Sequence, residues 1–136
     1  MKKTITIKNK LSELEIIRTE IDALLLKKLI PQNIINEIQL ITEEIVNNII
    51  SYAYDTHSED SITLNISILH NNIEIEFLDS GIPFNPLDRP DKDLFNHYKN
   101  AANGGLGIFF AKKFADQIAY KNDNGLNCLK IIKNIE

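Results

Sequence analysis

Two stretches in which apolar and polar residues strictly alternate limit the folds open to this chain of 136 residues. They cover residues 62–68 and 73–77, and Asn71–Asn72 lies between them. Alternation with a period of two places the apolar side chains of a strand on one face, and a pair of Asn residues suits a tight turn. The two stretches are therefore predicted to form a β-hairpin with one apolar face, which other elements have to cover.

Two earlier segments with apolar residues at helical spacing can supply that cover. The first predicted helix begins near Ser12, which together with Glu15 resembles a capping box, and Pro31 interrupts its apolar pattern. The second predicted helix has Pro31 in its first turn and runs to about Tyr54. The apolar positions of the first helix are Leu14, Ile17, Ile21, Leu24, Leu25 and Ile30.

The two ends of the chain complete the predicted sheet. Ile5 and Ile7 alternate with polar residues and indicate a short first strand, while Asp123–Gly125 predicts the turn of a second hairpin with its last strand at Cys128–Ile132. A helical pattern precedes this hairpin, at Leu106, Ile108, Phe109, Phe110, Phe114 and Ile118. The order of elements predicts an α+β fold in a single domain over residues 1–136. It would be a two-layer α/β sandwich, with the helices on one face of a mixed, mostly antiparallel sheet.

Charge and composition argue against several classes of partner. The chain has 15 Lys and Arg residues against 19 Asp and Glu residues, a net charge of -4, which argues against direct binding to nucleic acid. No stretch approaches the roughly 18 apolar residues that cross a bilayer, so no membrane partner is expected. Met1–Lys3 and the alternating residues after it do not resemble a secretory signal. The single Cys128 cannot form an internal disulfide, and we expect a cytoplasmic protein.

The second predicted helix carries two Glu and two Asn residues, Glu43, Glu44, Asn47 and Asn48. Glu44 and Asn48 share one face, at the border of the apolar stripe. A carboxylate there can act as a general base, because partial burial raises its pKa, and an Asn amide oxygen can bind Mg²⁺. On the helix alone a solvated flank fits these residues better, and the paired Glu and Asn residues leave the register open.

A second cluster of polar and turn-forming residues begins where the predicted hairpin ends, at residues 79–86. Asp79 stands at the end of a strand, and Gly81 lets the backbone turn sharply, which leaves the carboxylate facing a cavity. Such a group can accept a hydrogen bond from the exocyclic amine of a base such as adenine. Asp-Ser-Gly is also ordinary turn chemistry, which is the alternative interpretation.

Residues 80–104 form a long segment rich in Pro, Asp and Asn, a pattern that is often a lid or a binding loop. The segment leads into Asn103–Gly107, which is rich in Gly and precedes a predicted helix. Gly residues let the backbone approach an anion closely, and a helix N-terminus offers unpaired N–H groups. A phosphate cradle and a flexible hinge both fit this pattern.

Taken together, the three clusters resemble the ATP-binding domain of the gyrase, heat-shock chaperone, histidine kinase and MutL superfamily. Within it the chain is most similar to the anti-sigma-factor serine/threonine protein kinases, over nearly its whole length. Glu44 and Asn48, followed by Tyr52–Tyr54, resemble the first box of that family. Residues 79–86 resemble its second box. Its third box is resembled by Gly104–Gly107 and, further along the chain, by Asp116, Asn124–Gly125 and Asn127.

The resemblance implies a role for each box and two cofactors, ATP and Mg²⁺. Glu44 would be the base that activates the attacking hydroxyl, Asn48 the Mg²⁺ ligand, and Asp79 the residue that holds the adenine amine. The segment of about 85–104 would be the ATP lid. The implied nucleotide-binding residues are Asn48, Asp79, Gly81, Pro83, Phe84, Gly104, Gly105, Leu106 and Gly107.

The function implied by the resemblance is that of an ATP-binding serine/threonine protein kinase of the anti-sigma factor type. It would phosphorylate a Ser or Thr of an anti-sigma factor antagonist, sequester a sigma factor, or both, and the family likeness alone implies a homodimer. One alternative is a non-catalytic, ATP-gated protein-binding module. Another is the catalytic domain of a histidine kinase separated from its phosphoacceptor helix.

The chain departs from the family pattern at particular positions. Tyr52 stands where His is usual, and Lys130 stands in the last predicted strand, where these domains often place a Thr that supports adenine binding. The lid contains Arg89, Lys92 and Lys99, and none of them has a spacing that singles it out as a contact of the γ-phosphate. A solvated charge run is the better interpretation of these three residues.

Overall fold

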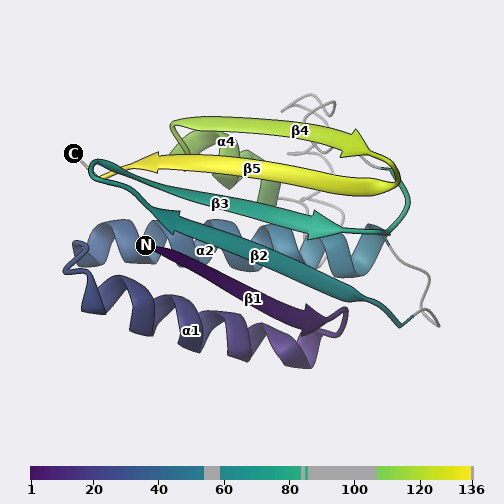
Figure 1. The fold of residues 1–136 in the computed structure, drawn as a ribbon, viewed down its shortest axis with the longest axis horizontal. Coiled ribbons are helices and arrows are strands. Elements are labelled where there is room, and N and C mark those ends of the chain that lie inside the picture. The colour runs from purple at the N-terminus through teal and green to yellow at the C-terminus, as the bar shows by residue number, and fades with distance from the viewer. Residues whose placement is uncertain (54–58, 84, 86–106, 136) are drawn as a thin grey trace.

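The computed structural model describes residues 1–53, 59–83, 85 and 107–135. Its strands are β1 (Lys2–Lys8), β2 (Ser61–Ile68), β3 (Asn72–Asp79), β4 (Gln117–Asp123) and β5 (Leu126–Asn134). They form one sheet in the order β1-β2-β3-β5-β4 (Figure 1). The predicted fold class is confirmed, and every neighbouring pair of these strands is antiparallel.

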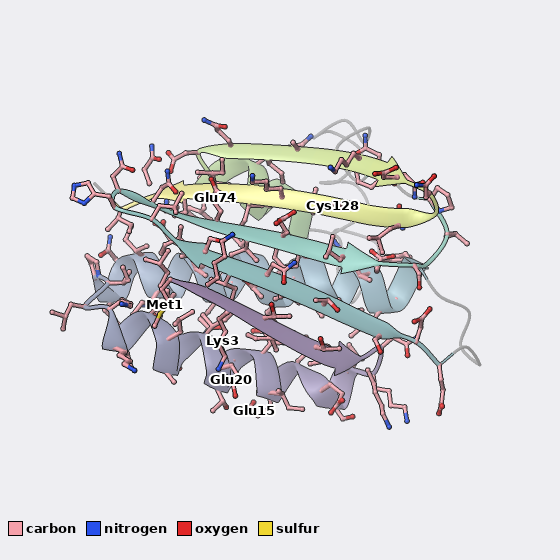
Figure 2. All side chains as sticks on the ribbon, viewed as in Figure 1. Met1, Lys3, Glu15, Glu20, Glu74 and Cys128 are labelled. Atoms are coloured by element: carbon pink, nitrogen blue, oxygen red, sulfur yellow. The ribbon has the colours of Figure 1, made fainter. Side chains whose placement is uncertain are left out.

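The helices of the described residues cover one face of this sheet (Figure 1). They are α1 (Leu14–Lys27), α2 (Gln32–Asn48) and α4 (Gly107–Phe114), with a 3-10 turn at Leu11–Glu13 and a π-helical turn at Ile49–Ala53. An ion pair of 2.7 Å between Lys3 on β1 and Glu20 on α1 joins the two layers at the sheet edge (Figure 2). None of the helices in the described part of the chain is long and apolar enough to cross a membrane.

The core lies between the helices and the inner face of the sheet, and isoleucine supplies most of it. Along β2 and β3 every second side chain is buried, as the alternation predicted. Full burial of each large aliphatic side chain contributes about 1.5–3 kcal/mol, which holds the helices on the sheet. The outer face carries Glu74 and Cys128, which point away from the helices (Figure 2). The fully buried side chains include Ile17, Ile21, Ile35, Ile38, Ile41, Ile45, Ile62, Leu64, Ile66, Ile73 and Phe77.

The starts of the two long helices differ from the prediction. No side chain caps α1 or α2, so the predicted capping box of Ser12 and Glu15 is wrong. Ser12 lies inside the 3-10 turn, because the α-helix begins only after it. The Glu13 carboxylate instead accepts a hydrogen bond of 3.2 Å from the backbone N–H of Lys8. Pro31 is the residue before α2, with an extended ψ of 142°, rather than a member of its first turn.

The last helix ends earlier than its apolar pattern predicted. α4 stops at Phe114, and Ile118 lies in β4, where it packs against the core. The backbone N–H of Asp116 bonds to the carbonyl of Ile132 at 2.8 Å. Pairing with β5 therefore replaces a further helical turn, and Ile118 packs against the core, partly buried, from a strand instead of a helix.

Lys133 on β5 ties the end of α4 to α2. Its ammonium lies 2.5 Å from the Glu37 carboxylate and donates a hydrogen bond of 2.8 Å to the carbonyl of Phe114. The Lys133 side chain is only 13% exposed, so water screens this pair less than a surface pair. A cation at a helix C-terminus is also favoured by the helix dipole. The contact anchors one end of α4, whose other end begins at Gly107.

We expect Lys133→Met to lower the free energy of unfolding by about 1–3 kcal/mol, because it leaves the partly buried Glu37 carboxylate without its cation. Lys130→Met is a matched control on the same strand, since Lys130 is 41% exposed and lies 3.4 Å from Glu74. The control is expected to cost less than about 1 kcal/mol. Urea unfolding measures both changes, and equal losses would show that the Lys133 pair has no special structural role.

Candidate functional site

The C-terminal ends of α2 and β3 and the turn between β4 and β5 lie at the same end of the molecule (Figure 1). This end carries Glu44 and Asn48 from the last turns of α2 and Asp79 from the last position of β3. Asn127, near the start of β5, is paired with Asp79 in the register of the sheet. Polar groups from three elements that are distant in sequence are thus placed at one end of the sheet.

The two neighbouring glutamates of α2 point to different surroundings. Glu43 is exposed and lies 3.6 Å from Arg18 of α1. Glu44 is half-buried, and this burial, with a smaller contribution from the Glu43 charge, raises the pKa of its carboxyl above the ordinary value. A carboxylate with a raised pKa binds a proton more readily than an exposed one, which suits a general base.

The two neighbouring asparagines differ in the same way. The Asn47 side-chain oxygen accepts a hydrogen bond of 3.3 Å from the Ser51 hydroxyl. The Asn48 side-chain oxygen is buried and has no hydrogen-bond partner within the described residues. A buried acceptor without a donor costs about 1–3 kcal/mol and calls for an explanation. An amide oxygen is a good Mg²⁺ ligand, so this ion would satisfy the buried Asn48 oxygen.

The helix changes its geometry directly after Asn48. The prediction extended an α-helix to about Tyr54, whereas residues 49–53 form a π-helical turn and Tyr54 lies outside the described residues. A π-helical turn is wider than an α-helical one and often occurs at functional sites. The 3.6-residue spacing that places Glu44 and Asn48 on one face therefore does not extend to Tyr52, which is exposed.

Asp79 is buried, with 4% of its surface exposed. Its Oδ1 accepts hydrogen bonds of 3.0 Å from the backbone N–H of Gly81 and from the side-chain amide of Asn127. Burial raises the pKa of the Asp79 carboxyl, the two hydrogen bonds partly offset this, and the charge of Asp60 adds to the rise. Both donors that the described residues supply meet Oδ1, so among these residues the other oxygen keeps its lone pairs for a further donor.

The turn that follows Asp79 is held from two sides. The Ser80 hydroxyl donates a hydrogen bond of 2.6 Å to the Asp60 carboxylate, beside the start of β2. The Asn127 amide donates to the carbonyl of Ile82 at 3.0 Å from the opposite side. The position of this turn is therefore set by side chains of the neighbouring strands and connections, as well as by its own sequence.

Asn127, and not Lys130, is the residue of β5 that faces Asp79. Lys130 is paired with Glu76 in the register and points to the outer face of the sheet. Side chains of a strand alternate between its two faces, so positions 127 and 130 cannot both face inward. The family resemblance included Asn127 but assigned it no role, and counting strand positions from the turn at Asn124–Gly125 is a signal that could have placed it on the inner face.

Several predicted site residues lie outside the described residues. These are Phe84, Gly104, Gly105, Leu106 and most of the predicted lid, with Arg89, Lys92 and Lys99. Of the other predicted contacts, Gly81 is half-buried and Pro83 is exposed in the turn after β3, and Gly107 is the first residue of α4. The predicted phosphate cradle is thus described only at its helical end.

Known proteins of similar sequence place this geometry in a family. Residues 7–133 match the family model described as the histidine kinase-like ATPase domain. The serine/threonine-protein kinase BtrW of Bordetella bronchiseptica is 24% identical over 92 residues, which are 68% of this chain and 65% of that protein. The chain therefore matches a little under two thirds of that relative's length.

Two solved structures have a fold similar to that of this chain. The RsbU and RsbW domains of a Mycobacterium tuberculosis protein give a TM-score of 0.71, with 13% identity over 98% of this chain and 32% of that chain. The SiaB–SiaC complex of Pseudomonas aeruginosa gives 0.61, with 16% identity over 96% of this chain and 89% of that chain. At these identities the likeness shows the fold alone. Since the family model matches nearly the whole chain, the chain belongs to the histidine kinase-like ATPase domain family.

Proposed function

We propose that this chain is a serine/threonine protein kinase of the anti-sigma factor type, which binds Mg·ATP where α2 and β3 end. The observation that carries the proposal is the pair on α2, a half-buried Glu44 carboxylate with a raised pKa and an Asn48 oxygen that is buried without a described partner. Family membership supports binding of ATP. The similarity to BtrW, which is named a serine/threonine-protein kinase, supports transfer to a hydroxyl group.

In this proposal each described residue has a separate task. Glu44 would accept the proton of the attacking Ser or Thr hydroxyl, and Asp79 would accept a hydrogen bond from the adenine amine. Asn48 would hold Mg²⁺ together with waters and phosphate oxygens, and the ion supplies positive charge against the phosphate oxygens. The backbone N–H groups at Gly107 and in the Gly-rich residues before it would bind the phosphates.

The proposed phosphoacceptor is a Ser or Thr of an anti-sigma factor antagonist, and a sigma factor is the proposed second partner. One solved structure of similar fold is the SiaB–SiaC complex, and another holds RsbU and RsbW domains in one protein, which supports a role in an assembly with a protein partner. We further propose that residues 1–136 act as one ATP-binding domain in the cytoplasm, with the lid at about 85–104. A homodimer stays a prediction of the family likeness.

We expect Mg²⁺ to raise the affinity of the wild-type chain for ATP by about tenfold or more, and Asn48→Ala to lose most of this gain. Isothermal titration with ATP, in Mg²⁺ and again in excess EDTA, measures both affinities. Asn47→Ala is the matched control, because the Asn47 oxygen is occupied by Ser51, and it should keep the gain. An undiminished gain in Asn48→Ala would assign the ion to other residues, and no ATP binding by the wild type would refute the proposed function.

A further inference from the structure

A row of polar side chains lies on the inner face of the sheet at the end where β3 finishes and β5 begins. In the register, Asp79 of β3 is paired with Asn127 of β5, and Asn127 is paired with Asn122 of β4. The next inward position of β5 is Leu129, which belongs to the core. Asn127 itself is only 4% exposed, so its amide depends on protein partners for its hydrogen bonds.

Both ends of the Asn127 amide are occupied. Its NH₂ group donates to Asp79 Oδ1 and to the Ile82 carbonyl, each at 3.0 Å. Its oxygen accepts hydrogen bonds from the Tyr120 hydroxyl and, at 2.9 Å, from the Asn122 side-chain amide. A backbone carbonyl can only accept, so the NH₂ group has to face Ile82, and the oxygen has to face the two donors of β4.

The residues of β4 therefore act on Asp79 without touching it. Tyr120 and Asn122 hold the oxygen of the Asn127 amide, and the amide in turn holds Asp79 Oδ1. Because Asn127 and Gly81 both donate to Oδ1, the second carboxylate oxygen of Asp79 has no donor among the described residues. Hydrogen bonds in such a chain also polarise one another, so the contact between Asn127 and Asp79 is stronger than it would be alone.

We propose that Tyr120 and Asn122 are positioning residues for base selection, which act through Asn127 to present the Asp79 carboxylate to a 6-amino group rather than a 6-oxo group. The inference rests on the proposed binding of a nucleotide at Asp79. A 6-aminopurine nucleotide donates to the free carboxylate oxygen, whereas a 6-oxopurine nucleotide places an acceptor against it. Loss of the two donors on β4 leaves the Asn127 amide held only on its NH₂ side, which weakens the contact that orients the Asp79 carboxylate.

The experiment compares ATP with inosine triphosphate, whose base carries an oxygen in place of the amine. We expect the wild type to bind ATP about 10- to 100-fold more tightly, as for a hydrogen bond to a charged group. Tyr120→Phe and Asn122→Ala should each reduce this ratio, and the double variant should reduce it about tenfold through weaker ATP binding alone. Isothermal titration in Mg²⁺ gives the four affinities, and thermal unfolding checks that each variant is folded.

Thr4→Val is the matched control, because it removes a side-chain hydrogen bond of 2.9 Å to Asn65 between β1 and β2. It should leave the ratio unchanged. An unchanged ratio in the double variant, or an equal loss of affinity for both nucleotides, would overturn the inference and leave the proposed function intact. Equal binding of the two nucleotides by the wild type would likewise overturn it, whereas binding of neither would refute the proposed function itself.

Discussion

Glu44→Gln is expected to slow transfer of the γ-phosphoryl group to a Ser or Thr hydroxyl by about 10²- to 10⁴-fold, the range typical of a lost general base. The affinity for ATP should stay within about threefold, because the amide has nearly the same size as the carboxylate. The rate should also fall as the pH drops through the raised pKa of Glu44. Labelled ATP and a candidate antagonist protein give the rate from pH 5 to 8.

Glu43→Gln is the matched control for this prediction. Glu43 is exposed beside Arg18, and its loss should change the rate by no more than about twofold. Because its charge helps to raise the pKa of Glu44, the control should move the acid limb of the profile to lower pH. Transfer by Glu44→Gln at the wild-type rate would contradict the role of Glu44. ATP binding by the wild type without any transfer would favour the non-catalytic module.

Asp79→Asn is expected to weaken ATP binding by about 100-fold and to keep the chain folded. The new amide can use its oxygen to accept from Gly81 and Asn127, as Oδ1 does now. Its NH₂ group then takes the place of the free carboxylate oxygen and meets the adenine amine, donor against donor. The affinity for inosine triphosphate relative to ATP should rise for the same reason.

The same substitution should raise the free energy of unfolding at neutral pH. Burial raises the pKa of Asp79 above its ordinary value of 3.8, so the folded state favours the protonated form. The stabilising contribution of Asp79 is complete below the ordinary pKa and is lost as the pH rises through the raised pKa. A neutral amide avoids this loss, and we expect the melting temperature at pH 7 to rise by about 2–5 °C.

Thermal unfolding at pH 3.5 and at pH 7 tests this expected stabilisation. The excess in melting temperature of Asp79→Asn over the wild type should shrink at the lower pH. Asp60→Asn is a control of opposite sign. The Ser80 hydroxyl and the backbone N–H of Ser61 lower the pKa of Asp60. The stability that Asp60 provides is present above its ordinary pKa, and Asp60→Asn should lower the melting temperature at pH 7.

Full ATP affinity in Asp79→Asn would contradict the proposed contact between Asp79 and the adenine base.

Much of the fold could be predicted because the signals are local. The alternation in residues 62–68 and 73–77 predicted β2 and β3, whose buried positions follow it. The turn at Asn124–Gly125 was predicted from residue type, and both residues have the positive φ values, 52° and 84°, that such a turn needs. Each of these features depends on neighbours a few residues away.

Other features depend on competition between elements. Ile118 continues the helical spacing of Phe114, yet pairing with β5 places it in a strand. The spacing of residues 44–48 predicted a shared face, but a π-helical turn follows directly after it. Periodicity indicates which secondary structure a segment prefers by itself. It does not include the hydrogen bonds that the segment gains by pairing with a neighbouring strand or helix.

The sequence by itself determined the fold class and the face that each helix and strand turns toward the core, because side-chain period is a local property of the backbone. It also brought Glu44 and Asn48 to one side of α2. Only the tertiary structure decided that Asn127, with Tyr120 behind it, meets Asp79. Asp79 and Asn127 are 48 residues apart, and the register that joins them is set by the packing of the whole sheet.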